Sequence, residues 1–121
     1  MTLINSNDFL DHAKFLIQND KPNEIMCRSA ASRAYYSLFH TTMLILLEKR
    51  VNLPKKEIHK FIYEYLYDHD TRIGRLYGAF KDDRIDADYK LGDTKFILTY
   101  VKTVVKEIED LINLINQKYK I

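Results

Sequence analysis

The chain has 121 residues, of which 46% are hydrophobic and 30% are charged, and its formal net charge is +2 at pH 7. This length predicts one globular domain over residues 1–121. So mild a positive net charge excludes a protein that binds nucleic acid through its overall charge alone. The single cysteine, Cys27, excludes an internal disulfide. No apolar stretch reaches the roughly 18 residues of a membrane helix, and no signal peptide is evident. We therefore expect a cytoplasmic protein that is not associated with a membrane.

The first half of the chain predicts two helices separated by a polar turn. The segment 6–20 opens with capping residues, and Leu10, Ala13 and Ile17 follow at helical spacing, which gives the helix one apolar face. A long second helix is predicted over residues 24–50. Its first half is rich in small residues and its second half is apolar nearly all round, which is typical of a helix buried on several sides.

Three further helices are predicted in the second half. The third and fourth have apolar residues at spacings of three and four over 58–66 and 73–80, although Gly74 and Gly78 each weaken the fourth by about 1 kcal/mol. A turn is expected at 90–93. The last helix carries the clearest pattern, a heptad seam formed by Ile97, Val101, Val104, Ile108, Leu111 and Ile115.

These elements predict an all-α protein, an antiparallel bundle of four to five helices. A bundle this small has difficulty in covering the wide apolar surface of segment 24–50. We therefore expect a homodimer, in which a second copy covers part of that surface.

Arg33 and His40 lie seven residues apart within the apolar second helix. Seven residues bring a helix back to nearly the same direction with a rise of about 10.5 Å, so both share one face with Tyr36 between them. An arginine that holds a phosphate and a histidine that moves a proton are a minimal set for phosphodiester cleavage. The alternative is structural, with Arg33 paired to a carboxylate and His40 hydrogen-bonded in the core.

The segment 81–90, KDDRIDADYK, places four aspartates around Arg84 and ends near Tyr89. A metal site is the weaker interpretation, because no histidine or cysteine lies in the segment and its spacing does not match a calcium-binding loop. We therefore expect no metal and no cofactor. The stronger interpretation is that some aspartates cap a helix or face solvent, while Asp88 pairs with a buried Arg33 or Arg84.

A resemblance to a known family lies in three pieces of the chain. The segments AASRAYYSLFHTTMLILL (30–47) and RIDADYK (84–90), with the lone His59 between them and a long final helix after them, resemble the HEPN domain family. The similarity is greatest to short, standalone bacterial and archaeal HEPN proteins and spans roughly residues 5–115.

The resemblance implies an antiparallel helical bundle that commonly dimerises and is linked to RNA. Many HEPN proteins are metal-independent endoribonucleases. Others are toxins paired with a small nucleotidyltransferase antitoxin, and others bind RNA or nucleotides without catalysis.

Active members of the family carry an arginine and a histidine, separated by four to six residues, near the start of a late helix. Arg84 corresponds best to that arginine, but positions 89–91, where the histidine would fall, hold tyrosine, lysine and leucine. Arg33 and His40 have six residues between them, so they satisfy the spacing in the second helix instead.

The sequence thus predicts a HEPN-type protein that binds RNA or acts on it, as a metal-independent endoribonuclease or as a toxin of a toxin–antitoxin or defence system. Arginine would stabilise phosphate charge, histidine would be the acid or base, and the remaining candidates would orient groups or shape the pocket. The candidate catalytic residues are Arg33, His40 and Arg84, and the candidates for binding or orienting a substrate are Tyr36, Asp88, Tyr89 and His59.

Two alternatives stay open. In one, the protein is a non-catalytic dimeric interaction module and the same polar residues form a buried network that fixes helix register. In the other, it is a nucleotide-binding accessory partner of a nucleotidyltransferase. An open cleft around Arg33 and His40 would favour a site, and a buried, fully paired network would favour the module.

Overall fold

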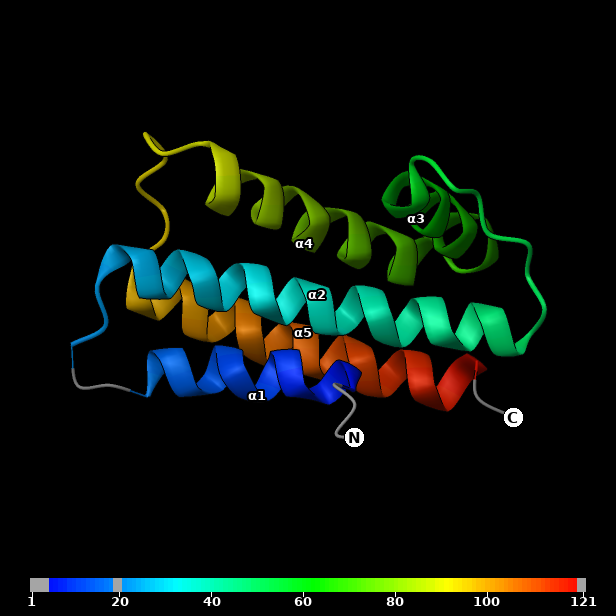
Figure 1. The fold of residues 1–121 in the computed structure, drawn as a ribbon, viewed down its shortest axis with the longest axis horizontal. Coiled ribbons are helices and arrows are strands. Elements are labelled where there is room, and N and C mark those ends of the chain that lie inside the picture. Colours follow the sequence, from blue (N-terminus) through cyan, green and yellow to red (C-terminus); the bar gives the residue numbers. More distant parts are fainter. Residues whose placement is uncertain (1–4, 19–20, 120–121) are drawn as a thin grey trace.

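The computed structural model describes residues 5–18 and 21–119, and these form five α-helices with no strand among them. The prediction of an all-α bundle is therefore confirmed. The helices run along the long axis of the molecule except α3, which lies across one end (Figure 1). The helices are α1 (Ser6–Ile17), α2 (Glu24–Glu48), α3 (Ile58–His69), α4 (Thr71–Tyr89) and α5 (Leu98–Tyr119).

Helix α2 is the centre of the bundle. It runs antiparallel to α1 and α4 and in the same direction as α5, and it contacts every other helix (Figure 1). Its buried residues point in all directions, which explains why its second half is apolar nearly all round. The premise that a second copy must cover α2 is wrong, because the other helices of the same chain cover most of it. Only Leu44 and Leu47 remain as large exposed apolar residues on its second half.

The apolar faces predicted for α1 and α5 are confirmed. Leu10, Ala13 and Ile17 are the buried residues of α1, which ends three residues earlier than predicted, and positions 19 and 20 lie outside the described residues. On α5 the seam is buried from Val101 onward. Its first predicted member, Ile97, precedes the helix and is 61% exposed.

A hydrogen bond fixes the register between α1 and α2. The hydroxyl of Ser37 donates to the backbone carbonyl of Ser6 at 2.6 Å, so the start of α1 lies beside the middle of α2. Ala30, Ala31 and Ala34 are buried along the first half of α2. Such short side chains allow a neighbouring helix backbone to approach closely.

Helices α3 and α4 meet in a tight corner at Asp70. The Asp70 side chain accepts a hydrogen bond from the backbone N–H of Ile73 at 3.1 Å and so caps α4. Gly74 is buried against α3, where a Cβ atom would meet the Cα of Tyr67 and lie 2.6 Å from its backbone nitrogen. The glycine that weakens α4 by propensity is therefore required for its packing.

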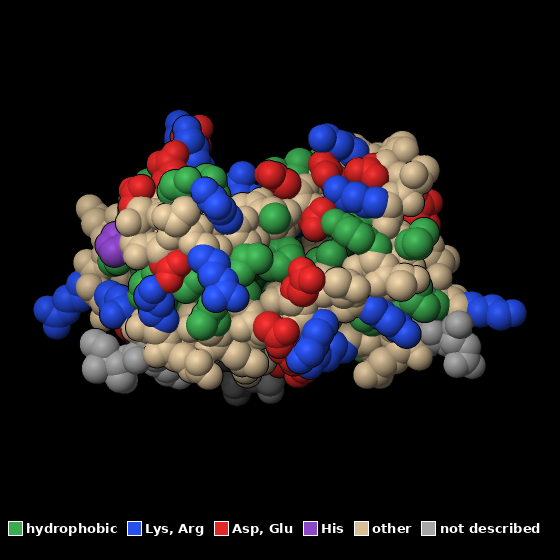
Figure 2. Space-filling model, turned by 180° about the vertical axis from the view of Figure 1, so that it is seen from behind, with side chains coloured by type: hydrophobic (Ala, Val, Ile, Leu, Met, Phe, Trp, Pro, Cys, Tyr) green, Lys and Arg blue, Asp and Glu red, His purple; other side chains and the backbone are tan. Residues whose placement is uncertain are grey.

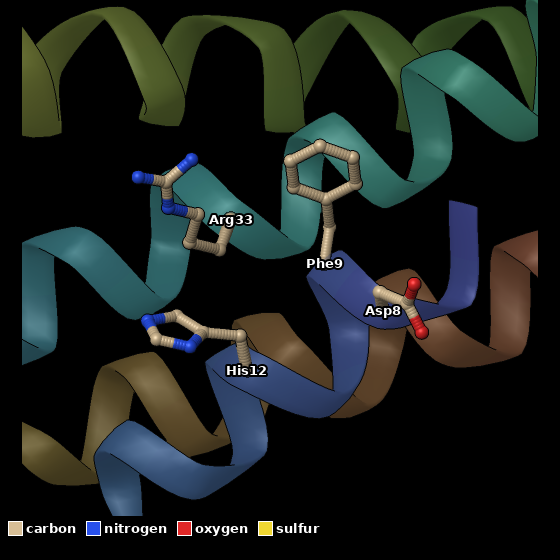
Figure 3. A pocket seen from close by; sticks show the side chains of 4 residues that line it. All are labelled: Asp8, Phe9, His12 and Arg33. Carbon is tan, nitrogen blue, oxygen red and sulfur yellow. The ribbon is translucent and has the colours of Figure 1, made fainter. Parts of the chain in front are cut away.

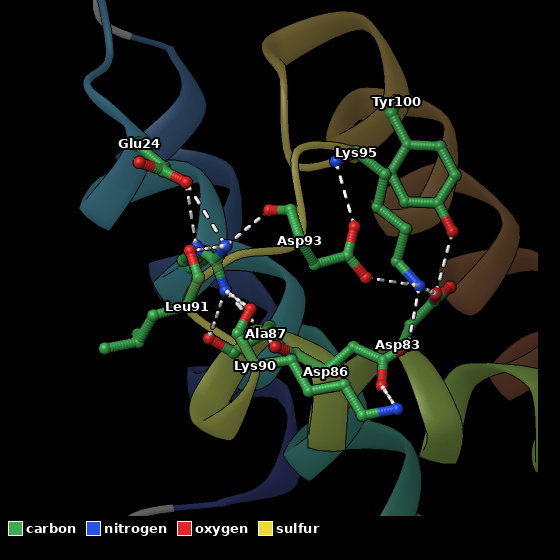
Figure 4. Close-up of polar contacts among 10 residues, drawn as sticks. Glu24, Asp83, Asp86, Ala87, Lys90, Leu91, Asp93, Lys95 and Tyr100 are labelled. Atoms are coloured by element: carbon green, nitrogen blue, oxygen red, sulfur yellow. Dashed lines mark hydrogen bonds and ion pairs between the residues drawn. The ribbon is translucent and has the colours of Figure 1, made fainter.

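The buried side chain of Arg28 holds the end of α4. Its guanidinium donates to five backbone carbonyls at 2.5–3.2 Å, and Figure 4 shows the residues to which these carbonyls belong. Glu24 lies 3.2 Å from the same group and Phe96 lies beneath it. One side chain thus satisfies the last carbonyls of α4 and the turn that follows. The five acceptors belong to Asp86, Ala87, Lys90, Leu91 and Asp93.

None of the described helices is both long and apolar enough to cross a membrane.

Candidate functional site

An open cleft of about 450 Å³ lies between α1, α2 and α4. Four residues predicted from the sequence line it, three from one face of α2 and one from the end of α4. The helical spacing therefore placed Arg33 and His40 correctly on a shared face. The lining is made by Phe9, Ser29, Ser32, Arg33, Tyr36, His40 and Asp88.

Arg33 is exposed at the cleft and forms neither a hydrogen bond nor an ion pair with any residue in the described part of the chain. The predicted alternative, in which it pairs with a carboxylate of the bundle, is not what these residues show. An arginine keeps its charge at every ordinary pH and offers a planar fork of donors. Arg33 is therefore available to an anionic ligand in the cleft.

His40 forms the aromatic end of the cleft. Its ring stacks on Phe9 with the centroids 5.1 Å apart and the planes 16° apart, and it lies 6.2 Å from the ring of Tyr36. Burial lowers the pKa of His40 below its ordinary value. The imidazole is consequently neutral at neutral pH, which is the form that accepts a proton.

Arg84 lies behind the cleft rather than in its lining. Its Nη2 donates to the hydroxyl of Tyr36 at 2.6 Å, and its Nε is 3.3 Å from Oδ2 of Asp88. The hydroxyl of Ser32 donates to the same Asp88 oxygen at 3.2 Å. The partner predicted for Asp88 is thus Arg84 and not Arg33. This network connects α2 to α4 and fixes the Tyr36 side chain at the cleft.

Tyr89 lies outside the cleft lining. It is 69% exposed, and its ring centroid is 5.9 Å from the guanidinium carbon of Arg84. The structure therefore places Tyr89 beside the arginine network and not in the pocket that it was expected to shape.

His59 belongs to the core between α2 and α3. Its Nδ1 lies 2.7 Å from the hydroxyl of Tyr35, which is itself 3.2 Å from the hydroxyl of Tyr77, and its ring stacks on Phe39 at 4.0 Å. Burial, and next the charge of Arg84, lowers the pKa of His59 to about 4. The structure does not bring His59 into the cleft, so an orienting role would have to act through the helix packing.

Two aspartates of 81–90, Asp83 and Asp86, are paired with lysines. The Nζ of Lys95 lies 3.0 Å from Asp83 and 2.7 Å from Asp86, and the hydroxyl of Tyr100 donates to Asp83 at 2.8 Å (Figure 4). The Lys95 ammonium, with Lys90 beside it, lowers the pKa of Asp86. Over the described ranges, no three histidine, cysteine or acidic side chains are grouped so as to hold a metal ion.

Sequence reasoning missed three cleft residues, Phe9, Ser29 and Ser32. Ser29 had a signal, because Ser29, Arg33, Tyr36 and His40 are spaced by four, three and four and so form one polar stripe, and Ser32 lies four residues before Tyr36 on the same side. Phe9 had none, since only the packing of α1 on α2 brings it to His40.

Comparisons of the chain with family models, with curated proteins and with solved structures found no match. The function is therefore inferred from the geometry of the cleft.

Proposed function

We propose that this chain is a HEPN-type protein that binds single-stranded RNA in the cleft between α1, α2 and α4 and cleaves it without a metal ion. The observation that carries the proposal is that Arg33 and His40 line one open cleft. An unpaired cation and a neutral base in a solvent-accessible cleft can bind and cleave a phosphodiester. An arginine and a histidine with a purely structural role would instead be buried and hydrogen-bonded.

The chemistry assigned to these residues is a transfer within the RNA. Arg33 binds the non-bridging oxygens of the phosphate and stabilises the charge that grows on them. His40 accepts the proton of the neighbouring ribose 2′-hydroxyl, whose oxygen attacks phosphorus as the bond to the 5′-oxygen breaks. Arg84 acts as a positioning residue, because it holds the hydroxyl of Tyr36 and the carboxylate of Asp88.

The size and lining of the cleft favour one nucleotide. Its volume of about 450 Å³ falls within the usual range of small-molecule pockets. Phe9 and Tyr36 offer aromatic surfaces, which bind bases by stacking without strong sequence preference. The face in Figure 2 mixes acidic and basic side chains and offers no continuous basic surface.

The test is incubation of the purified protein with single-stranded RNA in the presence of a chelator. We expect cleavage by the wild type and a fall of roughly 10²- to 10⁴-fold for His40→Ala, the usual contribution of a general base. His69→Ala is the matched control, because His69 is an exposed histidine on α3 outside the cleft. Equal rates for the wild type and His40→Ala would remove His40 from the mechanism.

A non-catalytic interaction module is the second candidate, favoured by the network of Arg84. This network joins Tyr36, Asp88 and Ser32 across α2 and α4 and would fix their relative positions without any ligand. RNA that binds but stays intact would favour this role. Binding of a free nucleotide alone would favour the accessory partner of a nucleotidyltransferase, which the volume of the cleft also permits.

We also propose a homodimer, as the HEPN resemblance implies, with a nucleotidyltransferase antitoxin as the other partner. Leu44 and Leu47, the exposed apolar pair on the second half of α2, are the residues on that helix that a second copy would cover. Sedimentation of the wild type beside Leu44→Lys tests this, and a wild type that sediments as a monomer at high concentration contradicts it.

A further inference from the structure

We propose that the cleft continues past Arg33 into a second subsite, where His12 donates a proton to the leaving 5′-oxygen of the RNA. This inference depends on the proposed ribonuclease function. It adds a second subsite and a second catalytic histidine. Neither was predicted from the sequence pattern around Arg33 and His40.

The second subsite is a hollow of about 290 Å³ between α1 and α2, lined by Asp8, Phe9, His12 and Arg33 (Figure 3). Phe9 and Arg33 also line the larger cleft. Two hollows that share two wall residues are neighbours, so Arg33 stands at their junction. A phosphate held by Arg33 would therefore have one nucleoside on each side.

The packing of α1 against α2 places one histidine in each hollow, His40 in the larger cleft and His12 in the second subsite. The bond between Ser37 and Ser6 fixes the antiparallel register, with Phe9 stacked on His40 and His12 sharing a hollow with Arg33. Phe9 and His12 are three residues apart on α1 and so are neighbours on its surface. The three rings of His40, Phe9 and His12 follow one another along the groove.

His12 is free to act. It is exposed and has no hydrogen-bond or ion-pair partner among the described residues, in contrast to His59, whose Nδ1 lies 2.7 Å from the Tyr35 hydroxyl. Figure 3 shows the nitrogen-bearing ends of His12 and Arg33 on the same side of the hollow, while Asp8 lies on the other side of Phe9. A group bound to Arg33 would therefore lie near His12 and away from the Asp8 carboxylate.

The two histidines together account for the protons that move in the cleavage step. His40 removes the proton of the 2′-hydroxyl, and the 2′-oxygen forms a bond to phosphorus. The bond between phosphorus and the 5′-oxygen breaks, and that oxygen takes its electron pair and the proton from the His12 imidazolium. The products are a 2′,3′-cyclic phosphate and a 5′-hydroxyl, and proton exchange with water restores both histidines.

The lining of the second subsite selects a nucleoside rather than another phosphate. Phe9 supplies an apolar surface for a base or sugar, while the Asp8 carboxylate repels phosphate and accepts hydrogen bonds from hydroxyl or amino groups. One Asp8 oxygen already accepts from the backbone N–H of Asn5 at 2.9 Å, which fixes the carboxylate at this end of the groove.

The test uses two RNA substrates of the same sequence, one ordinary and one with sulfur in place of the 5′-bridging oxygen at the cleaved bond. A thiolate leaves without protonation, so the sulfur substrate needs no proton donor. We expect His12→Ala to slow cleavage of the ordinary substrate by roughly 10²-fold or more and to cleave the sulfur substrate within about fivefold of the wild-type rate. His40→Ala should be slow on both substrates.

The controls separate failure of this inference from failure of the ribonuclease proposal. His69→Ala should match the wild type on both substrates, and His12→Gln should behave like His12→Ala. Cleavage that needs His40 but is unchanged in His12→Ala overturns the role of His12 and leaves the ribonuclease proposal standing. An equal loss of both substrates in His12→Ala also overturns proton donation, and a wild type that cleaves neither substrate overturns both proposals.

Discussion

Two arginines on α2, only five residues apart, have opposite surroundings. Arg28 is 7% exposed and donates to five backbone carbonyls, whereas Arg33 is exposed and has no partner in the described part of the chain. Burying an unpaired guanidinium would be very costly, so the buried one must be fully satisfied. The exposed one can remain unpaired at low cost, and this makes it a candidate for binding a ligand.

His59 gives a residue-scale prediction for stability. Its pKa is lowered from 6.5 to about 4 in the folded protein. The unfolded chain therefore binds a proton that the folded protein does not, and the free energy of unfolding falls as the pH drops from 6.5 toward 4. We expect a loss of about 1–2 kcal/mol over this range, a value reduced for the partial exposure of the ring.

Urea unfolding of the wild type and of His59→Gln across this pH range checks the prediction. The variant keeps a polar side chain but cannot titrate, so its free energy of unfolding should depend less steeply on pH. Parallel curves for the two proteins would show that another group causes the acid sensitivity.

At the scale of elements, the helices follow the apolar pattern, but their contacts follow side-chain size. Gly74 costs α4 helix propensity and yet sits where α3 and α4 come together. Gly78 is similar, because the ring of Tyr63 occupies the space of its missing Cβ, 2.6 Å away. The tight corner between these two helices therefore depends on residues that weaken one of them in isolation.

Gly74→Ala is the element-scale prediction. Alanine normally stabilises a helix interior by about 1 kcal/mol relative to glycine. Here its methyl group would clash with the backbone of Tyr67, so we expect a net loss of about 1–3 kcal/mol in the free energy of unfolding. Thermal and urea unfolding measure it.

Gly92→Ala is the matched control, because nothing lies within 4 Å of the position of its Cβ. It should leave stability nearly unchanged or raise it slightly. A Gly74→Ala protein as stable as the wild type would mean that α3 and α4 can separate without cost.

At the scale of the whole molecule, Arg28 joins parts of the chain about 60 residues apart in sequence, since it contacts the carbonyls of residues 86 to 93. Its guanidinium holds the turn that leads from α4 into α5. That turn lies directly after Asp88, which lines the cleft. The turn after α4, held by Arg28, therefore contributes to the geometry of the candidate site.

Arg28→Ala should lower the free energy of unfolding by about 2–4 kcal/mol, because several carbonyls lose a charged donor at once. Arg28→Lys should recover only part of this loss, since an ammonium lacks the planar fork that reaches acceptors on several sides. Arg33→Ala is the control and should stay within about 0.5 kcal/mol of the wild type. Equal effects of Arg28→Ala and Arg33→Ala on urea unfolding would contradict the bracing role.

The sequence by itself determined the helices and the face on which Arg33, Tyr36 and His40 lie. Both follow from the 3.6-residue period, which is a local property of the chain. It also anticipated that Asp88 pairs with an arginine, because a charge in a bundle needs an acceptor nearby.

Only the tertiary structure decided which arginine is buried, which is free and which braces the cleft. These differences depend on groups distant in sequence: the carbonyls after α4 reach Arg28, Asp88 pairs with Arg84, and α1 brings Phe9 and His12 to Arg33. Local sequence patterns carry no information on these contacts between distant residues, because the register between helices is set by packing and by single contacts such as that of Ser37 with Ser6. For the same reason, the sequence overestimated the need of α2 for a second copy.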